Sequence, residues 1–257
     1  MEGISIIVTV LNEGKNIRDL MVSLIPQEQP LEIIVVDSMS LDKTQDIMNE
    51  YSNKYDFIKY YREKTTRGAG RNYGVSRAKY GYVAFIDGDA VAGENWIKHL
   101  REYMGNYDLV AGTTKNTGNK NYSLERFKLF YNSFDVTLPS SNLMYSKDLF
   151  NKIGGFDAQF VTAEDIDLNI RAVNHGAKHT VCNNCIVYTK TRETLKDFKK
   201  QAYWNGYGRW QLKQKYDKTI NFKHSLTWEE VFSPRYVIRN FYGLKGYIHG
   251  RLEGKRK

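Results

Sequence analysis

Short runs of apolar, mostly β-branched residues recur in the first ninety residues, and segments of helical periodicity separate them. The runs are ISIIVTV (4–10), LEIIVVD (31–37), FIKYYRE (57–63) and YVAFID (82–87). Nearly continuous apolar runs of this length are typical of strands that are covered on both faces. Because such strands alternate with helices, the sequence predicts an α/β fold with a doubly wound, mostly parallel sheet flanked by helices.

The segments between these runs predict the helices. Residues 12–27 carry apolar side chains at helical spacing until Pro26 stops the pattern, and residues 40–55 repeat this arrangement. The segment RGAGRNYGVSRAKYG (67–81) is interpreted as a glycine-rich loop that enters a helix. This loop would be flexible enough to close over a ligand.

The pattern changes after residue 112. Residues 112–127 are polar and loop-like, whereas SSNLMYSKDLFNKIGGFD (140–157) predicts a strand, a short helix and a turn. EDIDLNIRAVNHGA (164–177) predicts a helix that ends at Gly176. KHTVCNNCIVYTK (178–190) predicts two short strands around Asn183 and Asn184, and the remaining residues are mainly helical in pattern.

The chain of 257 residues has a net charge of +9, which favours an anionic partner such as a nucleotide, a nucleic acid or a membrane surface. No segment approaches the roughly 20 apolar residues that span a bilayer. The N-terminus has no basic leader, and two cysteines in a chain of this length indicate a reducing compartment. We therefore expect a cytoplasmic protein.

Two aspartates, Asp87 and Asp89, close the fourth apolar run and are separated only by Gly88. Residues two apart in an extended segment point the same way, so both carboxylates would face one site. Unpartnered carboxylates are costly to bury, and neighbouring ones repel. Mg²⁺ and Mn²⁺ prefer oxygen ligands and usually bind one or two carboxylates together with substrate phosphates. We expect such a cation here, carrying a diphosphate; the alternative is a solvated turn.

Five motifs then make a family resemblance visible. They are IIVTVLNE (6–13), IIVVDSMSLDKT (33–44), RGAGRNYGVSRAKYGYVAFIDGDA (67–90), IGGFD (153–157) and AEDIDL (163–168). In this order and spacing they resemble family 2 glycosyltransferases of the GT-A fold, which use nucleotide-diphospho-sugars. The resemblance covers roughly residues 3–215. It implies an inverting, hexosyltransferase-type enzyme that moves a sugar from a donor to an acceptor hydroxyl or phosphate. UDP is favoured as the commonest nucleotide in the family.

The resemblance also implies roles for individual residues. Residues at the ends of the first two strands would hold the base and ribose: Thr9, Leu11, Asn12, Glu13 and Asp37. Arg71 and Arg67 would lie near the diphosphate, where guanidinium groups pair well with phosphate. Asp87 and Gly88 would lie near the ribose or the metal, and Asp89 would bind the metal, Mn²⁺ or Mg²⁺.

Glu164 and Asp165 open the helix of the AEDIDL motif, where the helix dipole favours ionised carboxylates. The family's catalytic base is the aspartate of this pair, which corresponds to Asp165. A general base must be deprotonated and within reach of the proton that it takes. Asp165 would deprotonate an acceptor hydroxyl as that oxygen attacks the anomeric carbon, with inversion. The alternative is a pair of ordinary N-terminal helix acids.

Two positions depart from the family pattern. Thr189 stands where many relatives carry a histidine that binds the metal, so metal coordination would depend on Asp89, the diphosphate and water. Gln201 and the Arg209–Trp210 pair are too far apart for the glutamine–arginine–tryptophan signature of processive members.

The C-terminal segment is basic and amphipathic. Val237, Phe241, Leu244 and Ile248 recur at helical spacing with basic residues between them. Such a helix can lie on an anionic membrane surface, or it can pack on the catalytic domain or on a second subunit. If it binds a membrane, the protein would be peripheral to the cytoplasmic face, and a lipid-linked acceptor would fit as well as a saccharide.

These interpretations divide the chain into three parts. Residues 1–112 form the nucleotide-sugar-binding half of one domain, 113–215 its acceptor-binding and catalytic-base half, and 216–257 the basic tail. Two rivals to the glycosyltransferase are a sugar nucleotidyltransferase and a noncatalytic polyanion-binding protein, although no specific nucleic acid is expected. His175, His179, Cys182 and Cys185 also admit a zinc site as a minor alternative.

Overall fold

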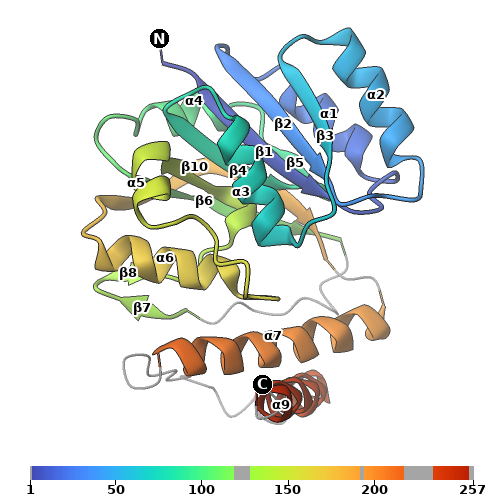
Figure 1. Cartoon of the computed structure of the whole chain (residues 1–257), viewed down its shortest axis with the longest axis vertical. Coiled ribbons are helices and arrows are strands. Elements are labelled where there is room, and N and C mark those ends of the chain that lie inside the picture. The colour runs from blue at the N-terminus through green and yellow to red at the C-terminus, as the bar shows by residue number, and fades with distance from the viewer. Residues whose placement is uncertain (1, 119–127, 192–193, 217–233, 255–257) are drawn as a thin grey trace.

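The computed structural model describes residues 2–118, 128–191, 194–216 and 234–254. Part of the polar loop predicted after residue 112, the start of the tail, and its last three residues, Lys255 to Lys257, lie outside the described residues. In the described part, eight strands form one sheet in the order β3-β2-β1-β4-β9-β6-β10-β5. Helices cover both faces of this sheet, and two further helices lie below it (Figure 1).

The sheet combines six parallel strands with two antiparallel ones. Its strands are β1 (Ile4–Val10), β2 (Leu31–Asp37), β3 (Ile58–Arg62), β4 (Tyr82–Asp87), β5 (Ala90–Ala92), β6 (Leu109–Thr117), β9 (Leu143–Ser146) and β10 (His179–Lys190). β9 runs antiparallel to β4 and β6, and β5 runs antiparallel to β10. A separate hairpin joins β7 (Phe130–Tyr131) to β8 (Phe134–Asp135). The predicted mostly parallel, doubly wound sheet is confirmed.

The helices follow the strands in the expected alternation. They are α1 (Ile17–Leu24), α2 (Thr44–Lys54), α3 (Arg67–Arg77), α4 (Trp96–Arg101), α5 (Lys147–Lys152), α6 (Glu164–Asn174), α7 (Leu195–Tyr216) and α9 (Pro234–Glu253), with a 3-10 turn, η2, at Ser140–Asn142. The predicted helix after the IIVVD strand and the helix of the AEDIDL motif are confirmed.

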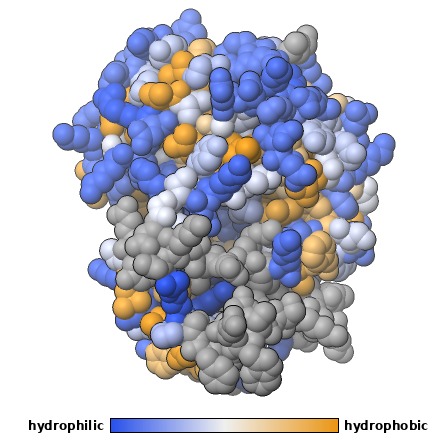
Figure 2. Space-filling model, turned by 180° about the vertical axis from the view of Figure 1, so that it is seen from behind, coloured by the Kyte–Doolittle hydropathy of each residue, from blue (hydrophilic) through white to orange (hydrophobic). Residues whose placement is uncertain are grey.

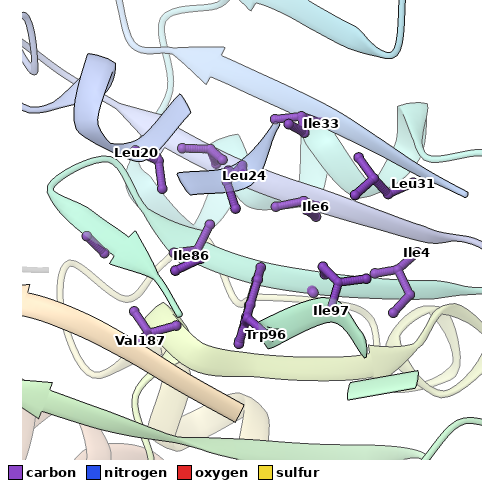
Figure 3. Packing of buried hydrophobic residues seen from close by; sticks show 14 of the residues in the cluster. Ile4, Ile6, Leu20, Leu24, Leu31, Ile33, Ile86, Trp96, Ile97 and Val187 are labelled. Atoms are coloured by element: carbon purple, nitrogen blue, oxygen red, sulfur yellow. The ribbon is translucent and has the colours of Figure 1, made fainter. Parts of the chain in front are cut away.

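The core consists of two apolar layers, one on each face of the sheet. Along β4, Ala84 and Ile86 belong to the layer beneath α1 and α4, while Val83 and Phe85 belong to the layer beneath α3, α5 and α6. Figure 3 shows the first layer, in which Ile86 lies among side chains of α1, α4 and the neighbouring strands. Burial of each such side chain contributes about 1.5–3 kcal/mol, which explains why these strands are apolar on both faces.

The glycine-rich segment begins directly as a helix, so the predicted loop was wrong, whereas the helix predicted in the same segment is confirmed. α3 begins at Arg67, and the hydroxyl of Thr66 caps it by accepting from the backbone N–H of Ala69 at 3.4 Å. The glycines serve close packing instead. A Cβ on Gly70 would lie 3.1 Å from Thr9 Cγ2, and one on Gly74 would lie 2.6 Å from Ile7 Cγ2.

The two strands predicted around Asn183 and Asn184 are one strand, β10, whose register against β6 shifts between Cys182 and Ile186. The irregularity absorbs the polar pair without ending the ladder. Cys182 and Cys185 flank it, are buried, and form a disulfide. The expectation of two reduced cysteines is therefore wrong, and bonded sulfurs cannot serve as the thiolate ligands of the minor zinc alternative.

The predicted boundary at residue 113 falls inside β6, which pairs with both β9 and β10 in the common sheet. The two proposed halves therefore share one sheet, while the boundary at 216 coincides with the end of α7. α7 runs beneath the sheet, and α9 packs on its far side (Figure 1). The two helices approach so closely that a Cβ on Gly246 would overlap the carbonyl oxygen of Tyr203.

Candidate active site

A cavity of about 690 Å³ lies between the carboxyl end of β4, the start of α6 and the two C-terminal helices. The residues around it come from segments far apart in the sequence. The residues that line it include Arg67, Asp87, Glu164 and Asp165; Thr113, Thr114, Asn116, residues 137–141 and Thr189; and, from α7 and α9, Gln201, Asn205, Arg209 and Arg239. The structure thus brings four of the predicted site residues together.

Arg71 occupies the position between the carboxylates of β4 and α6. Its guanidinium donates to Asp87 Oδ1 at 2.7 Å and to Glu164 Oε1 at 2.9 Å, and its side chain is almost completely buried. Part of the positive charge that Asp87 requires therefore comes from the protein itself. Arg71 does not line the cavity, whereas Arg67 lies on its wall near Asp87 and Glu164.

The IGGFD motif holds Arg71 in place. The side-chain amide of Asn72 donates to the carbonyl of Phe156 at 2.7 Å and accepts from its N–H at 2.8 Å. These bonds set the ring of Phe156 beside the Arg71 guanidinium, whose central carbon lies 5.2 Å from the ring centroid. The glycine-rich segment and the IGGFD motif, which are distant in sequence, thus together hold the Arg71 side chain in position.

Glu13 stands beside the Asp87–Gly88–Asp89 turn. Its pKa is raised, first by burial and then by the negative charges of Asp89 and Asp87, although a hydrogen bond from Asn16 opposes this. A Cβ on Gly88 would lie 2.7 Å from Val10 Cγ1 and 3.1 Å from Glu13 Cγ, so glycine lets the turn approach the end of β1. The three carboxylates therefore belong to one acidic cluster.

The predicted base-binding residues occupy the loops after β1 and β2. The N–H of Asn12 donates to Ser40 Oγ at 2.8 Å, and the N–H of Glu13 donates to Thr44 Oγ1 at 2.9 Å. Asp37 is fully buried, where it accepts from the N–H and hydroxyl of Ser40 and from the hydroxyl of Tyr60. Thr9, Leu11, Asn12, Glu13 and Asp37 do not line the cavity. Asp37 therefore fixes the loop around Ser40, and any direct contact with a base stays a prediction.

Arg67, the first residue of α3, lies among the site's acids. Its pKa is raised, mainly by the charge of Asp87 and further by Glu164, Asp165 and Asp89. Arg67 lines the cavity together with Asp87, Glu164 and Asp165, at a helix N-terminus whose dipole favours anions. Its charge and its place in the cavity suit it to bind a phosphate.

Asp165 has a raised pKa. Burial, together with the charge of Glu164, raises the pKa of Asp165 to about 6, although Arg71 and backbone N–H donors oppose the shift. Those donors are Ser140 at 3.3 Å and Ile166 at 2.9 Å. A carboxyl with such a pKa is ionised at neutral pH and basic enough to take a proton, as a general base requires.

The third acid of the motif, Asp167, has a structural role that the sequence analysis missed. It is fully buried, pairs with Arg171 at 2.8 Å and Lys215 at 2.7 Å, and accepts from the Tyr216 hydroxyl at 2.7 Å. It therefore ties α6 to the end of α7, and only the first two acids of the motif line the cavity.

Sequence analysis also missed the residues that α7 and α9 contribute to the cavity. Arg209 was considered only as part of a signature that it does not match, and Arg239 only as a basic residue of the tail. Thr189, the position of the expected histidine, does line the cavity, where its hydroxyl donates to Asn116 Oδ1 at 3.1 Å. The only available sequence signal for Arg239 was its place among the glycines of α9, whose packing cannot be read from periodicity alone.

The residues present fit a divalent cation that binds together with a ligand. Among the described residues, no group of three His, Cys, Asp or Glu side chains is arranged to hold a metal by itself. The cluster of Glu13, Asp87 and Asp89 nevertheless offers oxygen donors whose mutual repulsion a cation would relieve. Mg²⁺ and Mn²⁺ sites of this kind are usually completed by substrate phosphates and water.

The family model for glycosyl transferase family 2 matches residues 5–163, which is more than half of the chain. The chain therefore belongs to glycosyl transferase family 2. It is 28% identical over 198 residues to the glycosyltransferase AglE of Haloferax volcanii, and the alignment covers 71% of this chain and 65% of that protein. The chain thus spans just under two thirds of that relative's length.

Solved structures confirm the GT-A fold. Staphylococcus aureus TarS (residues 1–349) in complex with UDP-GlcNAc superposes with a TM-score of 0.64 at 20% identity, covering 96% of this chain and 82% of that one. The mannosyltransferase PcManGT from Pyrobaculum calidifontis, in complex with GDP-Man and Mn²⁺, superposes with a TM-score of 0.67 at 14% identity, covering 98% and 75%. Within the described residues, no helix is both long and apolar enough to cross a membrane.

Proposed function

We propose that the protein transfers a sugar, with inversion, from a UDP-sugar to an acceptor hydroxyl in glycan or glycolipid assembly. The observation that carries this proposal is the placement of Asp165 in one cavity with Arg67 and Asp87. The family match and the nucleotide-sugars bound by TarS and PcManGT support a nucleotide-sugar donor. The same findings favour a glycosyltransferase over a nucleotidyltransferase or a polyanion-binding protein.

In this proposal the donor lies across the carboxyl ends of β1 and β4. The loops at Asn12 and Glu13 face its nucleoside, and the Arg67 guanidinium pairs with the diphosphate as charge develops on it. Arg71 fixes Asp87 and Glu164 from below. Open α/β sheets bind their ligands at this edge of the sheet.

Asp165 acts as the general base. The acceptor hydroxyl gives its proton to the carboxylate as its oxygen forms a bond to the anomeric carbon. The bond from that carbon to the diphosphate breaks on the opposite face, and the electron pair leaves with the diphosphate. Because attack and departure occur on opposite faces, the configuration of the anomeric carbon inverts.

Glu13, Asp87 and Asp89 would hold the divalent cation, which supplies charge stabilisation of the leaving diphosphate when bound. The Mn²⁺ in the PcManGT complex supports this part of the proposal. Thr189 offers only a hydroxyl, so the protein's share of the coordination consists of carboxylates. We therefore expect metal binding to be strong only in the presence of a nucleoside diphosphate.

Thermal unfolding with a panel of nucleoside diphosphates, with and without Mn²⁺, tests the donor site. A ligand that binds only the native state raises the melting temperature by mass action. We expect UDP with Mn²⁺ to stabilise the wild type and to have little effect on Asp89→Ala. If no nucleoside diphosphate stabilises the wild type, the proposed donor site is wrong.

We further propose that α9 docks on an anionic membrane surface. Its glycine face packs on α7, which leaves the opposite stripe uncovered: Val237, Phe241, Leu244, Ile248 and Leu252 are each about half exposed. Lys245 flanks this stripe with its ammonium 5.4 Å from the centre of the Phe241 ring. Hydrophobic and hydrophilic residues lie next to one another at one lower edge of the molecule (Figure 2), and α7 and α9 lie at this lower end (Figure 1).

Charge complementarity favours a bilayer as the occupant of this stripe. Helical spacing places Lys245 on one side and Arg251 on the other side of the apolar residues. Nearby on α7, Leu195, Lys196, Lys199 and Lys200 line a shallow pocket with Tyr242. An apolar stripe between cations is typical of interfacial helices on anionic lipid.

Vesicle flotation tests this docking. We expect the protein to float with phosphatidylcholine vesicles that contain phosphatidylglycerol and to bind poorly to phosphatidylcholine alone. Phe241→Glu with Leu244→Glu should abolish flotation, whereas Val22→Glu, at an exposed apolar position on α1, should not. Absence of flotation, or a dimer in sedimentation that the double variant dissociates, would contradict membrane docking.

A further inference from the structure

We propose that the part of the cavity wall formed by α7 and α9 is a binding site for an anionic group, a phosphate, on the acceptor, and that Arg209 and Arg239 hold it. This inference depends on the proposed function, because it names the chemical class of acceptor that the same site would take. The acceptor would then carry a hydroxyl that reaches Asp165 and a phosphate that reaches the two arginines.

Two helices, α7 and α9, each place one arginine at the cavity. Arg209 comes from the middle of α7 and Arg239 from the first half of α9. Both line the cavity that contains Asp165. The close crossing of the two helices, at which a Cβ on Gly206 would overlap the carbonyl of Gly243, fixes their relative position.

The electrostatics of this wall favour an anion. The pKa of Arg209 is lowered, first by burial and then by the neighbouring positive charge of Arg239. Two guanidinium groups that line one cavity can donate charge-assisted hydrogen bonds to the same phosphate. The fork of an arginine also matches the geometry of phosphate oxygens.

The cavity wall carries charged groups of both signs. Asp87, Glu164 and Asp165 line it, and so do the two arginines. Neutral polar side chains that suit hydroxyl groups, such as Asn116, Gln201 and Asn205, line the same cavity. With the donor bound near Asp87 and Arg67, the two arginines would be left for the part of the acceptor beyond its reacting hydroxyl.

The α7 segment that carries Arg209 packs against the turn that precedes Glu164 and Asp165. A Cβ on Gly208, the residue before Arg209, would lie 2.9 Å from the Cβ of Ala163. Ala163 immediately precedes the first helical residue of α6 and has a positive φ of 63°. Contact between α7 and this turn thus fixes the distance from Arg209 to Asp165, which a site for a two-point acceptor needs.

The donor's own diphosphate is the other source of the same chemistry, so the experiment must separate the two. We would measure binding of glycerol 3-phosphate, with glycerol as the neutral control, by phosphorus NMR line broadening and by thermal unfolding. Each titration is done without nucleotide and with saturating UDP and Mg²⁺. The proteins are the wild type, Arg209→Gln, Arg239→Gln and the charge-matched control Arg18→Gln, which alters an exposed ion pair on α1.

We expect glycerol 3-phosphate to bind the wild type and Arg18→Gln in the presence of UDP, and glycerol not to bind. Arg209→Gln and Arg239→Gln should each weaken glycerol 3-phosphate binding at least tenfold while UDP affinity changes less than twofold. Melting temperatures close to that of the wild type would show that both variants are folded.

Three results would overturn the proposal. One is equal binding of glycerol 3-phosphate to the wild type and to both arginine variants, or no binding to any of them. Another is displacement of glycerol 3-phosphate by UDP. The third is a tenfold loss of UDP affinity in the arginine variants, which would assign these arginines to the donor diphosphate. If UDP fails to bind the wild type, the donor proposal fails, and the titrations without nucleotide still decide the arginine site.

Discussion

Arg71 of α3 donates to Glu164 of α6 at 2.9 Å, although 93 positions separate the two residues in the chain. The same guanidinium reaches Asp87 at the end of β4 at 2.7 Å. The buried guanidinium of Arg71 therefore connects the end of β4, on the donor side of the cavity, to the helix that carries Asp165. This connection explains how an acidic cluster can be folded before any ligand binds.

Removing the guanidinium of Arg71 should lower the free energy of unfolding. Arg71→Met leaves Asp87 and Glu164 without their buried partner, and breaking a buried ion pair in this way typically costs about 3–5 kcal/mol. We expect a loss of this size in the free energy of unfolding, measured with urea. Arg18→Met breaks the exposed pair with Glu50 and should lower the free energy of unfolding far less, because exposed ion pairs contribute little to stability. Equal losses in the two variants would contradict the structural role of Arg71.

The pH dependence of transfer should report Asp165. Burial and the charge of Glu164 raise its pKa to about 6, and only the ionised carboxylate accepts a proton. We therefore expect kcat/KM to be constant above neutrality and to fall about tenfold per pH unit below pH 6, as expected for a single essential base. A profile that stays flat down to pH 5 would show that the base has an ordinary carboxyl pKa.

The same raised pKa predicts an effect on stability. The native state binds the Asp165 proton more tightly than the unfolded state does, so this stabilising contribution is complete below pH 4 and is lost as pH rises through about 6. At pH 7.5, Asp165→Asn should therefore melt about 2–4 °C higher than the wild type, the shift that about 1 kcal/mol produces in a chain of this size. The difference should almost vanish at pH 3.5, below the ordinary pKa of the carboxyl group. A variant that is less stable at both pH values would contradict the assignment.

The crossing of α7 and α9 should not tolerate a side chain at its centre. Gly246→Leu places a side chain against the backbone of Tyr203, so α9 should leave α7. We expect limited proteolysis to cleave the variant rapidly near α9, while Asn240→Leu, at an exposed position of the same helix, should resemble the wild type. Equal cleavage of both variants would show that the glycine face is not the contact.

The sequence predicted the sheet well because its strands are apolar on both faces, a pattern that few other structures share. Glycine was harder to interpret, since it signals both flexible loops and close packing. In α3, Gly70 and Gly74 serve packing against β1, and only the neighbouring strands reveal this.

The candidate site was predicted in part. Asp87 and Asp165 could be located because they close a strand and open a helix, the positions that ligands use in α/β folds. The ion pair of Arg71 and the inward position of Arg239 depend on contacts between distant segments, which periodicity does not encode. Asp37 shows the converse case. It also closes a strand, and this position predicted contact with the base, but in the structure it is a buried carboxylate that accepts hydrogen bonds from Ser40 and Tyr60.

The central claim is that Asp165 is the base in transfer from a nucleotide-sugar. Release of UDP from a panel of UDP-sugars, with Mn²⁺ and mixed acceptors, by the wild type and Asp165→Asn tests it most directly, with UDP affinity measured on both proteins. We expect the wild type to turn over at least one donor, and Asp165→Asn to be slower by about 10²–10⁴-fold, the usual contribution of a general base, with UDP affinity unchanged. Equal turnover by the two proteins would contradict the account.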